Sequence, residues 1–110
     1  MNAFKFLALL VFLSIVTLSC QSGSSKMIYL ETKCADIWQT KENTPTDVLI
    51  SKVSDYLSQQ GIEFEEIEVI MNEEYAQNCE ACVCMSGRVI RLSATGKHVE
   101  GLNNLGFVKE

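Results

Sequence analysis

The chain has 110 residues, five of which are cysteines, and its formal net charge at pH 7 is −5. The acidic balance argues against a nucleic-acid partner, because binding to phosphates requires a basic face. It also argues against adhesion to an anionic membrane by charge alone.

The first 19 residues have the pattern of a bacterial signal peptide. Lys5 gives a short positive start, and an apolar run from Phe6 to Leu18 precedes the small residue Ser19. The run is shorter than the roughly 20 residues that a membrane-spanning helix needs. We therefore predict that segment 1–19 is a cleaved leader and not a permanent membrane span.

Cys20 directly follows the expected cleavage site. The tetrapeptide Thr17-Leu18-Ser19-Cys20 resembles the lipobox of bacterial lipoproteins, in which the cysteine becomes the lipidated N-terminus. The lipobox prefers Leu at the first position and a small residue at the second, so secretion without a lipid stays open as the alternative. Segment 20–26 is small and polar, as a tether between an anchor and a folded domain should be.

Lipidation of Cys20, for example with palmitate, would anchor the protein in the bacterial cell envelope. We expect the outer membrane, with the domain facing the periplasm, and membrane contact through the N-terminal lipid only. Residues 27–110 then form a single small domain.

The first half of this domain predicts a strand followed by a helix. Segment 26–33 alternates apolar and polar residues as a strand does, and it ends at Cys34. A helix is predicted from Thr44, which is expected to cap it, with Pro45 in its first position and Gly61 as its stop. The residues expected to form its apolar stripe are Leu49, Val53, Tyr56 and Leu57.

The second half predicts two strands, a weak helix and a short last strand. Segment 62–71 changes phase at Glu65-Glu66 and therefore needs a bulge there, or else begins at Glu66. Segment 83–93 is the third strand, 95–105 the weak helix and 107–108 the last strand. Ile90 and Leu92 share one face of the third strand and are expected to pack against the first helix.

The order strand, helix, strand, strand, helix, strand predicts an α+β fold of the ferredoxin-like, split βαβ type. Two helices would cover one face of a four-stranded antiparallel sheet. The first and third strands would be central antiparallel neighbours. Because the first strand then ends beside the start of the third, Cys34 should lie near Cys79, Cys82 and Cys84.

These four cysteines predict two structural disulfides, since exported proteins fold in an oxidising compartment. Four cysteines allow three pairings. Residues that face each other on antiparallel strands lie within disulfide range. On this ground we predict bridges between Cys34 and Cys84 and between Cys79 and Cys82.

Two other interpretations of these four cysteines stay open. Four thiolates can hold Zn or Cu(I), with Met85 as a possible thioether ligand. The pair Cys79 and Cys82 could instead be a thiol-disulfide redox motif. The redox reading is the weaker one because neighbouring acids would raise the thiol pKa; these acids are Glu73, Glu74 and Glu80.

No other catalytic constellation is visible in the sequence. His98 is the only histidine, which leaves most triads and histidine metal sites unsupported. We expect His98 to be solvated. The leading prediction is a small non-enzymatic envelope lipoprotein, stapled by disulfides, that serves as an accessory or interaction module for an unidentified envelope protein.

Two family resemblances bear on this prediction. Segment 33–38, the Cys79–Cys84 motif and Gly87-Arg88 resemble a group of small uncharacterised lipoproteins of Bacteroidetes-type bacteria, which implies a location but no activity. The expected fold also resembles heavy-metal-associated domains. Those domains carry Cys-x-x-Cys after the first strand, where this chain has only Cys34, so the resemblance does not extend to a metallochaperone role.

Overall fold

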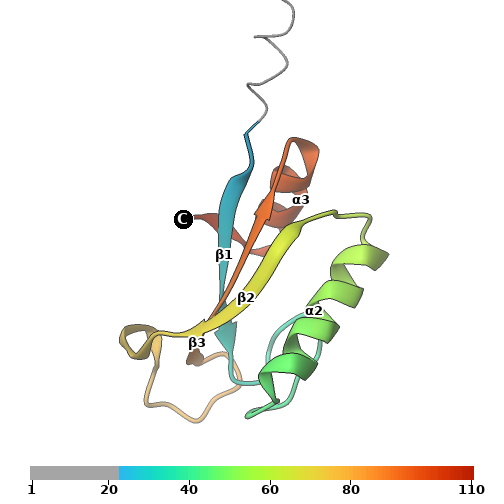
Figure 1. Cartoon of the computed structure of the whole chain (residues 1–110). Helices are drawn as coiled ribbons and strands as arrows, with labels where there is room; N and C mark the ends of the chain where they lie inside the picture. Colours follow the sequence, from blue (N-terminus) through green and yellow to red (C-terminus); the bar gives the residue numbers. More distant parts are fainter. Residues whose placement is uncertain (1–22) are drawn as a thin grey trace, which may run out of the picture.

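The computed structural model describes residues 23–110, which form a sheet and two α-helices in the predicted order (Figure 1). The elements are β1 (Ser25–Thr32), α2 (Thr46–Gln59), β2 (Glu65–Met71), the short 3₁₀-helix η1 (Glu73–Tyr75), β3 (Met85–Ala94), α3 (Lys97–Leu105) and β4 (Val108–Lys109). The predicted leader 1–19 and Cys20 lie outside the described residues. β1 begins at Ser25, so the end of the predicted tether 20–26 already belongs to the sheet.

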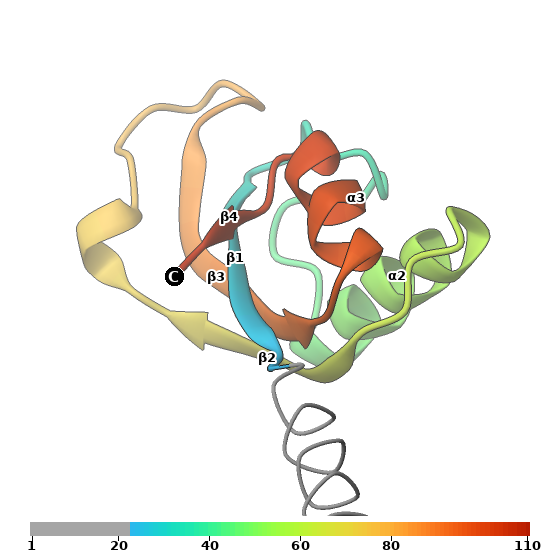
Figure 2. The ribbon, with the colours of Figure 1, turned by 90° about the horizontal axis from the view of Figure 1, so that it is seen from above.

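The strand order is β2-β3-β1-β4, and every neighbouring pair is antiparallel. Both helices cover the same face of this sheet (Figure 2). The first strand ends beside the start of the third, because Thr32 lies opposite Met85. The ferredoxin-like α+β fold is therefore confirmed.

The core lies between the sheet and the two helices. Leu57 is 0 % exposed, as the apolar stripe of α2 predicts. The described residues that build the centre of the core are Met27, Leu49, Val53, Leu57, Ile90, Leu92, Leu102 and Phe107. Each such side chain contributes about 1.5–3 kcal/mol through removal from water.

The start of α2 differs from the prediction. Thr44 does not cap the helix; its hydroxyl donates a hydrogen bond to the Lys41 carbonyl at 2.5 Å. Pro45 stands in the cap position with an extended backbone, and its carbonyl accepts from Leu49 N at 2.9 Å. Because Pro45 has a ψ of 145°, it is not helical, so the helix begins at Thr46, and Thr44, bonded to Lys41, belongs to the preceding turn.

The predicted bulge in the second strand is confirmed. The register between β2 and β3 shifts between Glu65 and Glu68, and Glu66 has a φ of 49°. The strand begins at Glu65, three residues later than expected. Ile62 stays outside it, yet its side chain is in the core and its N–H is bonded to Leu57 O.

Gly106 ends α3 in a left-handed conformation and provides the first test of the packing. Its φ is 107°, and a Cβ there would lie 3.2 Å from Cε2 of Tyr29. Gly61, after α2, has a φ of 72° but no atom near its Cβ position. Gly61→Ala should lower the free energy of unfolding by about 1–2 kcal/mol through backbone strain alone. Gly106→Ala should lower it by more, because Tyr29 is held by its neighbours and must also shift. Equal losses in urea denaturation would contradict this contact.

Candidate functional site

The cysteines meet at the end of the sheet where β1 ends and β3 begins. The bridges join Cys34 to Cys82 and Cys79 to Cys84, with Cα–Cα distances of 4.5 and 6.0 Å. The prediction that all four cysteines meet at this end is confirmed, and so is the expectation of two disulfides. The predicted pairing was wrong.

The pairing follows from how the β1–β3 ladder continues beyond its strands. Lys33 N donates to Cys84 O at 2.8 Å, and Cys34 N donates to Cys82 O at 3.1 Å. Between these two bonds the chain turns, with Cys84 N bonded to Ala81 O. The turn places Cys82 next to Cys34. The sequence prediction extended the third strand back to residue 83, whereas β3 begins only at Met85.

The disulfides also test the two alternative interpretations of the cysteines, a redox motif and a metal site. Cys79 and Cys82 belong to different bridges, so the Cys-x-x-Cys pair does not form a two-cysteine redox motif. All four sulfurs are bonded to sulfur, and residues 23–110 contain no group of three or more His, Cys, Asp or Glu that could hold a metal ion. Cys84 is buried, whereas Cys79 and Cys82 are exposed.

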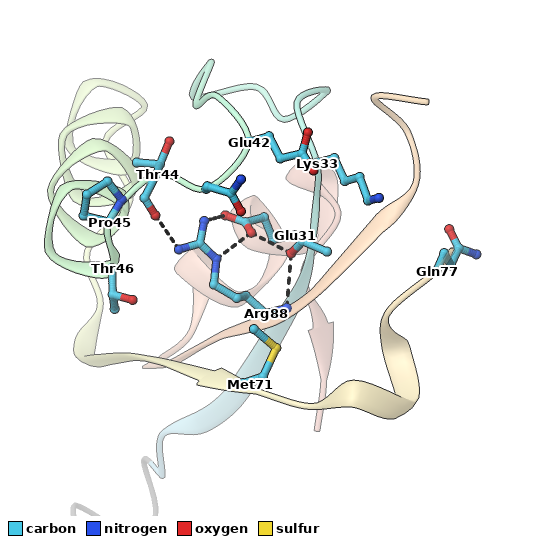
Figure 3. Close-up of a pocket in the computed structure, with 11 residues that line it drawn as sticks. Glu31, Lys33, Glu42, Thr44, Pro45, Thr46, Met71, Gln77 and Arg88 are labelled. Carbon is cyan, nitrogen blue, oxygen red and sulfur yellow. Dashed lines mark hydrogen bonds and ion pairs between the residues drawn. The ribbon is translucent and has the colours of Figure 1, made fainter. Parts of the chain in front are cut away.

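Beside the cysteines lies a buried ion pair that the sequence analysis did not identify. Glu31 and Arg88 form a bidentate salt bridge, in which the Nε–Oε1 and Nη2–Oε2 distances are both 2.7 Å (Figure 3). Ser86 Oγ donates a third bond to Glu31 at 2.6 Å. The Glu31 side chain is 3 % exposed and that of Arg88 is 14 % exposed. One signal was present: Glu31 shares its strand face with Met27 and Tyr29, which are apolar or aromatic, so an acid there requires a partner.

Arg88 also binds the turn that precedes α2. Its Nη1 donates to the Thr44 carbonyl at 2.6 Å, so the guanidinium joins β3 to the turn before the helix (Figure 3). A cavity of about 540 Å³ opens between this turn and the β2–β3 connection, with Met71 and Gln77 on its other side. All the polar side-chain atoms of Glu31 and Arg88 already make hydrogen bonds within the domain. The pair is therefore suited to fixing the two walls of the cavity and not to binding a ligand in it.

A second polar cluster closes the turn after Cys34. Asp36 Oδ1 accepts hydrogen bonds from Tyr29 OH (2.9 Å), Thr32 Oγ1 (2.9 Å) and Thr32 N (3.2 Å). The turn places Trp38 against Tyr29, edge to face, with ring centroids 4.6 Å apart. Trp38 is 6 % exposed and belongs to the core cluster. Burial raises the pKa of Tyr29, and the Asp36 carboxylate adds to that effect.

Asp36 should make stability depend on pH. Burial raises the pKa of this carboxyl above its usual value, and Oδ2 is buried without a partner among the described residues. At pH values between the unfolded pKa of about 3.9 and the raised folded pKa, Asp36 is therefore protonated in the folded state and ionised in the unfolded chain. Stability contributed by protonated Asp36 is fully present below the unfolded pKa and is lost as pH rises through the folded pKa. Asp36→Asn keeps the Oδ1 acceptor and cannot ionise. The free energy of unfolding of the wild type should therefore fall relative to that of the variant as the pH rises above about 4, as measured by urea denaturation. Parallel pH profiles would contradict the raised pKa.

His98 lies away from the cysteines, at the start of α3. Its Nδ1 accepts a hydrogen bond from Glu63 N at 3.1 Å, and its side chain is 15 % exposed. The expectation that it is solvated was therefore wrong, since the ring is mostly buried and its Nδ1 satisfies the backbone donor of Glu63.

Comparison with protein-family models, curated proteins and solved structures finds no match for this chain. The resemblance to small Bacteroidetes-type lipoproteins stays a prediction. Within residues 23–110, neither helix has the length and apolar character needed to cross a bilayer.

Proposed function

We propose that this chain is a small lipoprotein of the bacterial envelope whose domain acts as a non-enzymatic accessory or interaction module. The observation that carries the proposal is the pair of disulfides at one end of a small domain. Disulfides form and persist in oxidising compartments outside the cytosol. A domain of this size also buries only a modest fraction of its surface, so it benefits from cross-links.

The spacing between Cys20 and β1 fits an anchor. Four residues separate Cys20 from Ser25, the first residue of β1. A chain of that length spans about 18 Å at most. A lipid on Cys20 would therefore hold the start of β1 close to the membrane. The disulfide end, at the other end of the strand, would point away from the membrane toward periplasmic partners.

The state of the chemically active side chains favours an interaction module over an enzyme. The four cysteine sulfurs are engaged in bridges, and His98 is held by Glu63 at the other end of the sheet. The bonded sulfurs also favour a disulfide module over a zinc or Cu(I) protein.

The test is expression of the full chain in a Gram-negative host, followed by mass spectrometry. We expect a lipidated N-terminal Cys20 and recovery in the outer-membrane fraction, and the Cys20→Ser variant should lose the lipid. A maleimide reagent applied under denaturing conditions should label none of the other four cysteines before reduction and all four after it. An unlipidated Cys20 would overturn the anchor, and four free thiols that retain zinc would favour the metal-binding alternative.

A further inference from the structure

Within residues 23–110, no strand pairs with the outer edge of β2, so the backbone groups on that edge are unpaired there. β2 is an end strand of the sheet, with β3 on one side only (Figure 1). In an antiparallel ladder, alternate residues direct their backbone groups to the partner strand. Asn72 N donates to Gly87 O at 2.7 Å, and Ile70 lies opposite Val89 in the same register. The backbone N–H and C=O groups of Ile70 and Asn72 thus point toward β3. Those of Val69 and Met71, the alternate residues, therefore point outward.

Apolar side chains accompany this free edge. Ile70 is 39 % exposed and Met71 is 62 % exposed, and Tyr75 of the adjoining η1 is 41 % exposed. At the N-terminal end of β2, the bulge at Glu66 interrupts the regular pairing with β3. The regular edge therefore covers residues 68–71. Unpaired backbone groups flanked by exposed apolar side chains form a template for the addition of another strand.

The charge around this edge determines what kind of strand can be added. From residue 53 to residue 87 the chain contains eight Asp and Glu and neither Lys nor Arg. The acids that flank the edge are exposed and make no ion pair with another residue of 23–110; they are Glu65, Glu66, Glu73 and Glu74. A second copy of the same edge would bring like charges together, which opposes self-pairing.

We propose that the free edge of β2 binds an extended basic segment of an envelope protein by strand addition. This inference rests on the proposed role as an interaction module and names the surface and the chemistry of the partner. Backbone hydrogen bonds to Val69 and Met71 would provide the pairing. Lys or Arg side chains of the segment would meet the flanking glutamates, and its alternate apolar residues would cover Ile70.

The probe for this proposal is the peptide acetyl-Lys-Val-Lys-Val-Lys-Val-Lys-amide, titrated into the full-length chain in detergent micelles. Its matched control replaces each Val with Pro, which keeps the charge but removes alternate backbone donors. We expect saturable binding of the Val peptide, with amide chemical-shift changes at residues 68–71, and at least tenfold weaker binding of the Pro peptide. Equal binding of the two peptides would show charge attraction without strand addition and would overturn the proposal.

Variants of the edge separate pairing from charge. Met71→Pro removes an outward-facing donor, which an edge strand tolerates, and should weaken binding about tenfold; Met71→Ala keeps the donor and should weaken it less. Glu73→Gln with Glu74→Gln should weaken binding and reduce its salt dependence, whereas Asp47→Asn with Asp55→Asn on α2, an equal change in charge, should not. If Met71→Pro fails to fold by circular dichroism, the glutamine variants and the Pro peptide still decide the question. Unchanged binding by the edge variants, or a dimer in ultracentrifugation that blocks the peptide, would overturn the proposal.

The Cys20→Ser variant distinguishes this proposal from the anchor. It should bind the Val peptide as the wild type does, because the edge is built only from the folded domain. Loss of the lipid with retained binding would contradict neither proposal. A lipidated chain that does not bind would overturn the strand-addition site alone.

Discussion

Replacing Glu31 with Gln is expected to lower the free energy of unfolding by about 3–5 kcal/mol, because it leaves the Arg88 guanidinium buried without a counter-charge. The substitution keeps the shape of the side chain. It also places an amide donor toward a guanidinium that only donates, so one of the two Glu31–Arg88 contacts is lost as well. Urea denaturation with both disulfides intact would measure the loss.

Two variants serve as controls for this expectation. Glu68 pairs with Arg91 on the surface, where the side chains are 55 % and 31 % exposed. Glu68→Gln should therefore change the free energy of unfolding by only about 0.2–1 kcal/mol. The double variant Glu31→Leu with Arg88→Met removes both charges and should be less damaging than Glu31→Gln alone. Similar losses for Glu31→Gln and Glu68→Gln would show that Arg88 is solvated well enough without its partner.

The parts of the fold that could be predicted from the sequence are those set by periodicity. The stripe through Leu49, Val53 and Leu57 has a helical period, so it indicated which face of α2 is buried. The phase change at Glu65-Glu66 indicated either a bulge or a strand that begins at Glu66, because a strand cannot otherwise move its apolar side chains from one face to the other. The structure has the bulge. These signals are local and repeat over several residues, so an error of one residue at an end does not change the fold.

The details of the site depend on single residues at the ends of strands, where periodicity gives no signal. One turn, closed by the bond from Cys84 N to Ala81 O, moves Cys82 instead of Cys84 next to Cys34. The partner of Glu31 lies 57 residues away in the sequence, so only the strand register brings the two charges together. The buried carboxyl of Asp36 depends on a turn that no repeating pattern describes.

The corrected pairing leads to an expected difference between the two bridges. Cys34 and Cys82 are 48 residues apart in sequence, whereas Cys79 and Cys84 are five apart. In the chain-entropy model a bridge restricts the unfolded chain more when it closes a longer loop. The model gives a loss of about 4 kcal/mol for Cys34→Ala with Cys82→Ala, and about 2 kcal/mol for Cys79→Ala with Cys84→Ala.

The measurement is urea denaturation of the two double variants without reductant. The Cys34–Cys82 variant should be the less stable, although Cys84 is buried and its truncation adds a small packing loss to the other variant. Reduction of both bridges in the wild type should remove about 6 kcal/mol, which is comparable with the whole stability of a small domain. The reduced chain should then be largely unfolded at modest urea concentrations. If the short-loop variant were the less stable, the bridges would act through packing at the end of the sheet and not through the unfolded chain.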